Sequence, residues 1–348
     1  MRGQNLILFV LRTVATVAAI AVVLGAVPAR ADREADKLFE PEKPGKGAKL
    51  LAVGPKGNRL YVRLDEDSKW IEAIDSGNGK VKARYEGRGP ATCACVDGGN
   101  DWLLAGDAEG RVFRWDLKTG KRTAIVRLKD RDDKGRAVSG IVPSRRGGVY
   151  VLSRGLLVEI SKAVFTAGYS VKTDVRAAFR KEGHEMAFFS DRKDLVITNP
   201  GDGTYHGFKV SKAQELWVLD LGYTTTTFFD VEREDFFFEG TNSLRLIHGR
   251  KGKVLEERKR VSVVCGAATE DGETFYVGLG NGRLQEYVLE RRSRMTRSSG
   301  WDKFEAAITA VVLGPKEKRL YVSDSAGYLY KIRVESSRGD DRRSARLD

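Results

Sequence analysis

Cysteine and histidine, which commonly form disulfide frameworks, metal sites and catalytic triads, are scarce in this sequence. Only three cysteines and three histidines occur among its 348 residues. Because an odd number of cysteines cannot all pair within one chain, a disulfide scaffold is excluded, and an apolar core must stabilise the fold. Long helical periodicity is also missing, although residues 172–182 are amphipathic enough for one or two helical turns.

Long hydrophobic runs are missing after residue 31. Residues 13–27 are almost wholly apolar, Arg2 and Arg12 precede them, and Ala29-Arg30-Ala31 has the small-x-small pattern of a signal-peptidase site. We therefore predict a secretory signal peptide over residues 1–31 and a periplasmic or extracellular mature protein. An uncleaved membrane anchor is the alternative, since apolar residues 6–11 extend the run towards the roughly 20 residues that span a bilayer.

The chain is basic, with 61 Lys and Arg against 48 Asp and Glu, and it stays basic without residues 1–31, which contain three arginines and no acidic residue. This surplus favours acidic partners, although a solvated surface carrying both signs is the simpler explanation. For an exported chain we expect another envelope or extracellular protein, or an anionic polymer, as partner, and not nucleic acid. We expect a monomer.

An apolar triplet recurs seven times along the chain. The middle residues of the triplets are 39 to 47 residues apart, with a mean of about 43, which is the length of a four-stranded propeller blade. The triplets LYV, WLL, VYV, LVI, FFF, FYV and LYV are centred on Tyr61, Leu103, Tyr150, Val196, Phe237, Tyr276 and Tyr321.

A second apolar position lies eight residues before the centre of each triplet, and a polar turn separates the two. Glycines mark two further turns in several units, because tight turns need positive φ. Gly110 and Gly282 mark the turn after the second strand, and Gly79 and Gly120 mark the turn after the third strand. Each unit therefore has four strands. The second apolar position is Val53, Cys95, Val142, Phe188, Phe229, Ala268 or Leu313.

Seven four-stranded units without helices predict an all-β fold, a seven-bladed β-propeller of antiparallel blades over residues 48–335. The last unit has only three strands, so we predict that residues 32–47 supply its outer strand through Leu38 and Phe39 and close the ring. The similar stretches GPKGNRLYV from Gly54 and GPKEKRLYV from Gly314 would then be neighbours at the seam of the ring. Residues 336–348 are predicted to form a disordered basic tail.

Two short stretches carry a resemblance to known propellers. LLAGDAEGRVFRWDLKTGK, residues 103–121, resembles a WD-repeat blade through Trp115-Asp116, and AIDSGNGKV, residues 73–81, resembles the turn of quinoprotein-type repeats. The periodicity extends the resemblance over about residues 48–334, but only Trp115-Asp116 fits the Trp-Asp pair that ends the third strand of a WD repeat. Gly183-His184 lies too close to the next strand to match the Gly-His pair of WD repeats.

The resemblance implies a function as well as a fold. WD-repeat propellers are mostly non-catalytic platforms for partner proteins, so we expect an exported, non-enzymatic protein- or ligand-binding scaffold. The alternative is an exported enzyme, either a quinoprotein-like oxidoreductase or a lactonase-type hydrolase. The five tryptophans stand at differing repeat positions, unlike the docking motif of catalytic quinoproteins, and we therefore expect no cofactor.

The candidate reactive residues stand at unrelated repeat positions. Cys95 occupies an apolar core position and Cys265 lies several units from Cys93, which favours packing over a metal or redox site. No nucleophile elbow, haem-attachment motif or phosphate loop occurs, so we predict no catalytic or metal residues. The three histidines, which we expect in solvated loops, are His184, His206 and His248.

One basic segment is the candidate binding site. Arg291, Arg292, Arg294 and Arg297 gather between the sixth and seventh units, and Trp301 follows shortly after. Such a segment could bind an anionic polymer, and a solvated connection between two blades is the alternative.

Overall fold

The computed structural model describes residues 35–41, 49–65, 67–97, 99, 101–128, 136–161, 175–224, 227–231, 234–290, 294–302 and 304–334. All of them belong to one compact unit, residues 34–348. The predicted signal peptide and C-terminal tail lie outside the described residues. Within those ranges, no helix is both long and apolar enough to cross a membrane.

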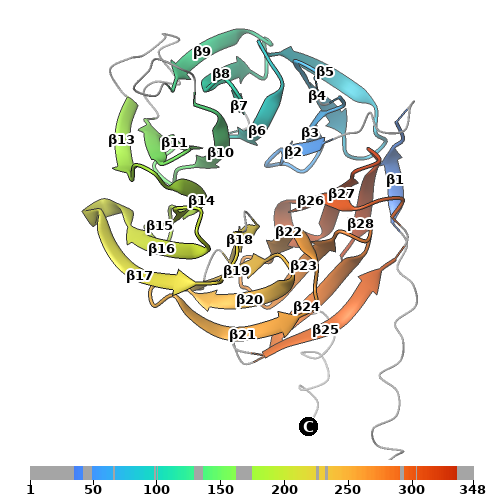
Figure 1. Cartoon of the computed structure of the whole chain (residues 1–348). Coiled ribbons are helices and arrows are strands. Elements are labelled where there is room, and N and C mark those ends of the chain that lie inside the picture. Colours follow the sequence, from blue (N-terminus) through green and yellow to red (C-terminus); the bar gives the residue numbers. More distant parts are fainter. Residues whose placement is uncertain are drawn as a thin grey trace, which may run out of the picture. The chain divides into compact units, whose positions relative to one another are not determined.

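Seven four-stranded antiparallel sheets are arranged in a ring (Figure 1). In six blades the strands follow the chain order from the inner edge to the outer edge, and the seventh blade takes its outer strand from the N-terminal segment. The predicted seven-bladed β-propeller is therefore confirmed. Two single 3-10 turns, η1 (Val210–Lys212) and η2 (Pro315–Glu317), complete the described elements.

The four strands of each blade are named in order from the inner edge outwards. Blade 1 contains β2 (Lys49–Val53), β3 (Arg59–Arg63), β4 (Trp70–Asp75) and β5 (Val81–Glu86); blade 2 contains β6 (Ala91–Val96), β7 (Trp102–Asp107), β8 (Arg111–Asp116) and β9 (Arg122–Arg127); blade 3 contains β10 (Val138–Pro143), β11 (Val149–Ser153), β12 (Leu156–Ile160) and β13 (Val175–Arg180); blade 4 contains β14 (Glu185–Ser190), β15 (Leu195–Asn199), β16 (Thr204–Lys209) and β17 (Gln214–Asp220). Blade 5 contains β18 (Phe228–Asp230), β19 (Phe236–Gly240), β20 (Ser243–His248) and β21 (Lys253–Lys259); blade 6 contains β22 (Val263–Ala268), β23 (Thr274–Leu279), β24 (Leu284–Glu290) and β25 (Arg294–Trp301); blade 7 contains β26 (Ile308–Leu313), β27 (Arg319–Asp324), β28 (Leu329–Arg333) and β1 (Asp36–Phe39).

The seven triplet centres occupy the second strand of their blades, and each is at most 9% exposed. A second strand has a blade packed against both of its faces, so it is apolar almost continuously instead of alternating with polar residues. In blades 5 and 6 the packing between neighbours is aromatic. Phe238 stacks on Phe229 at 4.9 Å and on Phe275 at 4.1 Å, and Phe275 stacks on Tyr287 at 5.2 Å between ring centroids.

The predicted glycine turns are also confirmed. Gly79 and Gly120, between the third and fourth strands, have φ of 71° and 70°, and Gly110 and Gly282, between the second and third strands, have φ of 79° and 76°. A Cβ atom would be strained in this left-handed region, which is why glycine recurs at these positions.

The N-terminal strand closes the ring as predicted. β1 pairs antiparallel with β28, with Asp36 opposite Lys331, Lys37 opposite Tyr330 and Phe39 opposite Leu329. Leu38 and Phe39 pack, partly buried, on an apolar cluster that contains Tyr321 and Leu329. Pairing covers the edge of β28 that would otherwise remain open.

The two similar nonapeptides meet at this seam. The hydroxyl of Tyr321, in the second nonapeptide, donates a hydrogen bond of 3.2 Å to the carbonyl oxygen of Gly57 in the first. Gly57 has a φ of 67°, and a Cβ added to it would lie 2.9 Å from Cδ of Pro315. The repeated sequence therefore builds two facing turns, one on each side of the seam.

Two sequence-based expectations need correction. Residues 175–180 form β13, the outer strand of blade 3, and not helical turns, because the edge of β12 offers them backbone partners that an isolated helical turn lacks. Residues 294–301 are not a connection between blades 6 and 7 but form β25, the outer strand of blade 6, hydrogen-bonded to β24.

Candidate functional site

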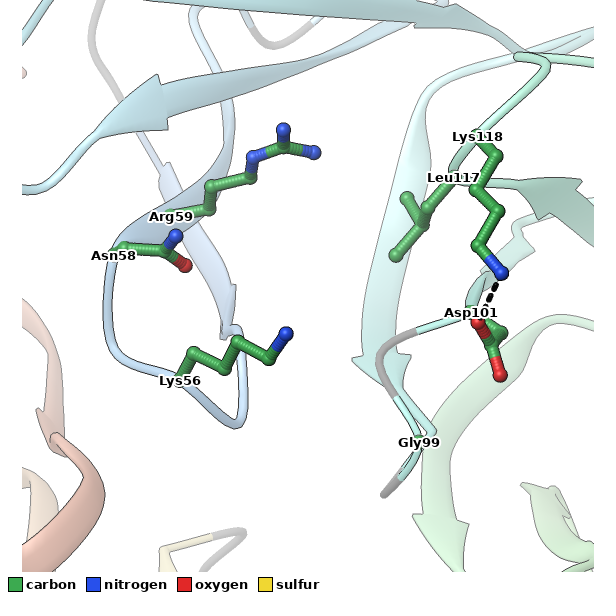
Figure 2. Close-up of a pocket in the computed structure, with 7 residues that line it drawn as sticks. All are labelled: Lys56, Asn58, Arg59, Gly99, Asp101, Leu117 and Lys118. Carbon is green, nitrogen blue, oxygen red and sulfur yellow. Dashed lines mark ion pairs between the residues drawn. The ribbon is translucent and has the colours of Figure 1, made fainter.

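A pocket with a volume of about 640 Å³ opens between blades 1 and 2 (Figure 2). Blade 1 contributes the turn between its first and second strands, and blade 2 contributes the turns that precede β7 and follow β8. Figure 2 shows the side chains of Lys56 and Arg59 extending from blade 1 towards the blade 2 wall. The lining residues are Lys56, Asn58, Arg59, Gly99, Asp101, Leu117 and Lys118.

The blade 1 wall is held from two sides. The carbonyl oxygen of Gly57 accepts a hydrogen bond of 2.6 Å from the hydroxyl of Ser76, in addition to that of Tyr321 from blade 7. The backbone N–H of Ser76 donates to the carbonyl of Asn58 at 3.1 Å. Because the turn is anchored at successive residues, the backbone that carries Lys56 and Asn58 is positioned before any ligand arrives.

The blade 2 wall is organised by two aspartates. Oδ1 of Asp97 accepts hydrogen bonds from the backbone N–H groups of Asp101 at 2.9 Å and Trp102 at 2.7 Å. Oδ1 of Asp116 accepts hydrogen bonds from the N–H groups of Lys118 at 2.8 Å and Thr119 at 2.7 Å, and these donors hold the pKa of Asp116 below its ordinary value. Both turns of blade 2 are thus fixed by side-chain caps.

The charges in the pocket do not balance. Nζ of Lys118 lies 3.3 Å from Oδ1 of Asp101, so the one acidic residue of the lining is already paired. Lys56 and Arg59 form no ion pair within the part of the chain that the structure describes. The pocket therefore presents two uncompensated positive charges to an incoming group.

Arg59 interacts electrostatically with two buried tyrosines. Burial raises the pKa of both Tyr61 and Tyr85, and the positive charge of Arg59 opposes that rise in each case. The two rings are 6.2 Å apart and belong to the core shared by blades 1 and 2. Arg59 therefore lies beside rigidly packed aromatic side chains of this core.

This arrangement suits recognition of an anion. A guanidinium, an ammonium and the Asn58 amide together supply donors for a carboxylate or phosphate group. Among the described residues, no group of three or more His, Cys, Asp or Glu side chains is placed to hold a metal ion.

The sequence-predicted binding segment is divided by the structure. Arg294 and Arg297 are exposed on β25, whereas Arg291 and Arg292 lie outside the described residues. Trp301 is 2% exposed and packs against Tyr276 with ring centroids 6.3 Å apart, so its ring belongs to the core between blades 6 and 7. Anionic polymer binding by the arginines stays a prediction.

The cysteines are placed as the sequence indicated. Cys93, Cys95 and Cys265 are free thiols. Burial raises the pKa of Cys93 to about 11 and that of Cys265 to about 12, and it also raises that of Cys95. Such thiols are weak nucleophiles at neutral pH.

The histidines depart from expectation. His206 and His248 lie on strands β16 and β20 and not in loops. The rings of His184 and His206 meet edge to face with centroids 5.1 Å apart, and Nδ1 of His206 lies 2.9 Å from Oε2 of Glu215. Burial, together with the neighbouring His206, lowers the pKa of His184. This histidine pair could not be predicted from the sequence, because the contact depends on how the β13–β14 connection packs against β16.

The residues of the Trp-Asp motif have structural roles. Trp115 is 1% exposed and packs edge to face on Tyr85 at 6.3 Å, while Asp116 caps the turn that begins with Leu117. The motif thus positions the blade 2 wall of the pocket without supplying a reactive group.

The pocket residues were not identified from the sequence. Lys56 and Arg59 stand in the first nonapeptide, which indicated structural register only, and Lys316 and Arg319 hold the same positions in the second. The repeat alone could not distinguish the two pairs, because only the first faces the pocket on blade 2.

No protein-family model and no curated protein sequence matches this chain. Among solved structures, it is similar to a chain in the crystal structure of the mitotic checkpoint complex, with a TM-score of 0.67 and 13% identity, over 89% of this chain and 97% of that one. It is also similar to the crystal structure of the RRP9 WD40 repeats, with the same TM-score and identity, over 89% of this chain and 99% of that one. At this identity the similarity establishes the fold alone, a WD40-like seven-bladed propeller.

Proposed function

We propose that this protein is an exported, non-enzymatic binding scaffold, and that the pocket between blades 1 and 2 receives an acidic side chain of an envelope or extracellular partner protein. The observation that carries the proposal is the pair of cations, Lys56 and Arg59, which have no ion-pair partner among the described residues. Export rests on the signal-like sequence of residues 1–31.

The physical case is one of preorganisation. A hydrogen bond to a charged group contributes about 1.5–3 kcal/mol when water is excluded, and less at an open site. Because both walls are already fixed by the hydrogen bonds of Gly57 and Asp97, little loop ordering is needed on binding, so more of this energy is retained as affinity. The similarity to a chain of a multiprotein complex is in keeping with a scaffold.

The test compares two matched double variants. Lys56→Ala/Arg59→Ala empties the pocket of its free cations, and Lys316→Ala/Arg319→Ala removes the same two residue types from the corresponding turn of blade 7. The probe is an array of hexapeptides that carry Asp or Glu at each position in turn, with Asn or Gln counterparts.

We expect the wild-type protein to retain a subset of acidic peptides over their amide counterparts at low salt, and to lose them as salt screens the charges. The pocket variant should lose about tenfold or more in affinity, which corresponds to about 1.4 kcal/mol. The blade 7 variant should bind as the wild type does. Equal losses in both variants, or no preference for acidic peptides, would refute the proposal.

The enzymatic alternative has its own measurement. Pyrroloquinoline quinone, calcium and zinc, each in large excess, should leave the melting temperature of the wild-type protein unchanged. A ligand that binds only the folded state at about 100 times its Kd would stabilise it by about 2.7 kcal/mol, so stabilisation by any of the three would favour an enzyme.

A further inference from the structure

Two basic runs that are distant in sequence meet at the outer edge of the ring. Nη2 of Arg258, on β21, donates a hydrogen bond to the carbonyl of Met295, on β25, and the N–H of Met295 donates to the carboxylate of Glu256. Figure 1 shows β21 and β25 side by side as the outer strands of blades 5 and 6. The end of β21 is therefore hydrogen-bonded to the beginning of β25.

Four exposed cations surround this junction. Lys259 and Arg260 directly follow Arg258, while Arg294 directly precedes Met295 and Arg297 lies two residues beyond it. Consecutive Cα atoms are about 3.8 Å apart, so the connectivity keeps all four close to the contact between the strands. We call these four residues the basic rim.

Among the described residues, the cations at this junction differ in whether they form an ion pair. Arg258 is compensated by Glu256, with Nε 3.2 Å from Oε1. None of the four basic-rim residues forms an ion pair within the ranges that the structure describes. Burial raises the pKa of Tyr287 and the charges of Arg297 and Arg258 oppose the rise, which places cations of both strands near one phenol.

The surroundings of the basic rim indicate what kind of anion it fits. In the described part of the chain, the exposed large apolar residues lie on other strands, with none on β21 or β25. A membrane-binding surface combines cations with apolar side chains that insert into the bilayer, and a protein interface needs buried anchors. A solvated linear polyanion needs only distributed charge contacts. The exposed apolar residues are Trp70, Val81, Leu216, Val218 and Val264.

We propose that the basic rim binds a linear anionic polysaccharide. The chain would lie across the junction of blades 5 and 6, with its acidic groups against Lys259 and Arg260 on one side and Arg294 and Arg297 on the other. Binding is electrostatic, driven by release of the counterions condensed on the polymer, and weakens as salt rises.

The test uses two double charge reversals of equal size. Lys259→Glu/Arg294→Glu removes one cation from each side of the basic rim. Arg127→Glu/Arg180→Glu changes the net charge equally at exposed residues that end the outer strands of blades 2 and 3. Affinity for polygalacturonate, a linear carboxylate polymer, is measured by titration at low and moderate salt, with neutral dextran as the blank and circular dichroism to verify folding.

We expect the wild-type protein to bind polygalacturonate. The affinity should fall by about tenfold or more in the basic-rim variant, which corresponds to about 1.4 kcal/mol, and by less than about threefold in the control. Equal losses in both variants would overturn the proposal, as would preferred binding to phosphatidylglycerol vesicles. The variant Lys56→Ala/Arg59→Ala should bind polygalacturonate as the wild type does, so this test can fail or succeed independently of the proposed pocket.

Discussion

The closure strand can be probed through a single glycine in blade 1. Gly79 and Gly120 occupy the same turn in blades 1 and 2, with φ of 71° and 70°. A Cβ added to Gly79 would lie 1.8 Å from the carbonyl oxygen of Leu38 on β1, whereas one added to Gly120 would meet no atom within 4 Å. The substitutions Gly79→Ala and Gly120→Ala therefore differ in one respect, the contact with β1.

The magnitudes follow from this difference. Both variants place alanine in the left-handed region, which costs about 1–2 kcal/mol. Gly79→Ala must in addition displace β1, whose backbone pairs with β28 at Asp36, Lys37 and Phe39. At about 1 kcal/mol for each lost hydrogen bond, we expect a further loss of about 2–3 kcal/mol. Gly79→Ala should thus cost about 3–5 kcal/mol in total.

Urea unfolding measures both losses, and amide hydrogen exchange reports on β1 directly. We expect faster exchange of the β1 amides in Gly79→Ala and unchanged exchange in Gly120→Ala. Deletion of residues 32–44 should cost little more in the Gly79→Ala background, because the two changes remove the same contacts. Equal losses of stability in the two alanine variants, with protected β1 amides in both, would refute this account of ring closure.

Three further predictions concern the core, the thiols and the histidine pair. Phe237→Ala, which truncates a fully buried ring next to Phe188, should cost about 3–5 kcal/mol in urea unfolding, and a loss below about 1 kcal/mol would contradict its role. The three cysteines, with pKa values raised by burial, should react with iodoacetamide at pH 8 only as the protein unfolds, so rapid alkylation of the native protein would contradict their placement. The pKa of His184 is lowered from 6.5, so the unfolded state binds more protons below about pH 6.5, and stability should fall as the pH drops through that range. His184→Gln should flatten this dependence in unfolding curves recorded at successive pH values, and an unaltered slope would count against it.

Most of the fold could be predicted because a propeller repeats one local pattern. In each blade an apolar triplet indicates the second strand, and glycines such as Gly79 and Gly110 indicate turns. Both signals depend only on residues that are neighbours in sequence. The closure strand was also predictable, since three strands in the last unit leave an edge that needs a partner. One exception was β13, where amphipathicity at short range was overridden by pairing with β12. The other was β25, which pairs with β24 where the sequence indicated a connection between blades.

The candidate sites were much less predictable. The pocket brings Lys56 and Arg59 of one blade together with Asp101 and Lys118 of another. The basic rim brings residues 259–260 together with Arg294 and Arg297. A sequence periodicity reports what successive blades share, whereas these sites depend on which side chains of different blades the packing brings together.

Apolar spacing and glycine placement along the chain were enough to specify the number of blades, the position of the turns and the closure by the N-terminal segment. Which charges are unpaired, and which surfaces they form, depends instead on how the blades pack. That packing buried Trp301 away from the arginines that precede it and brought Arg258 to Met295. The reason is physical: backbone geometry and burial follow from local pattern, whereas the partner of a charge is whatever the packing of neighbouring blades places beside it.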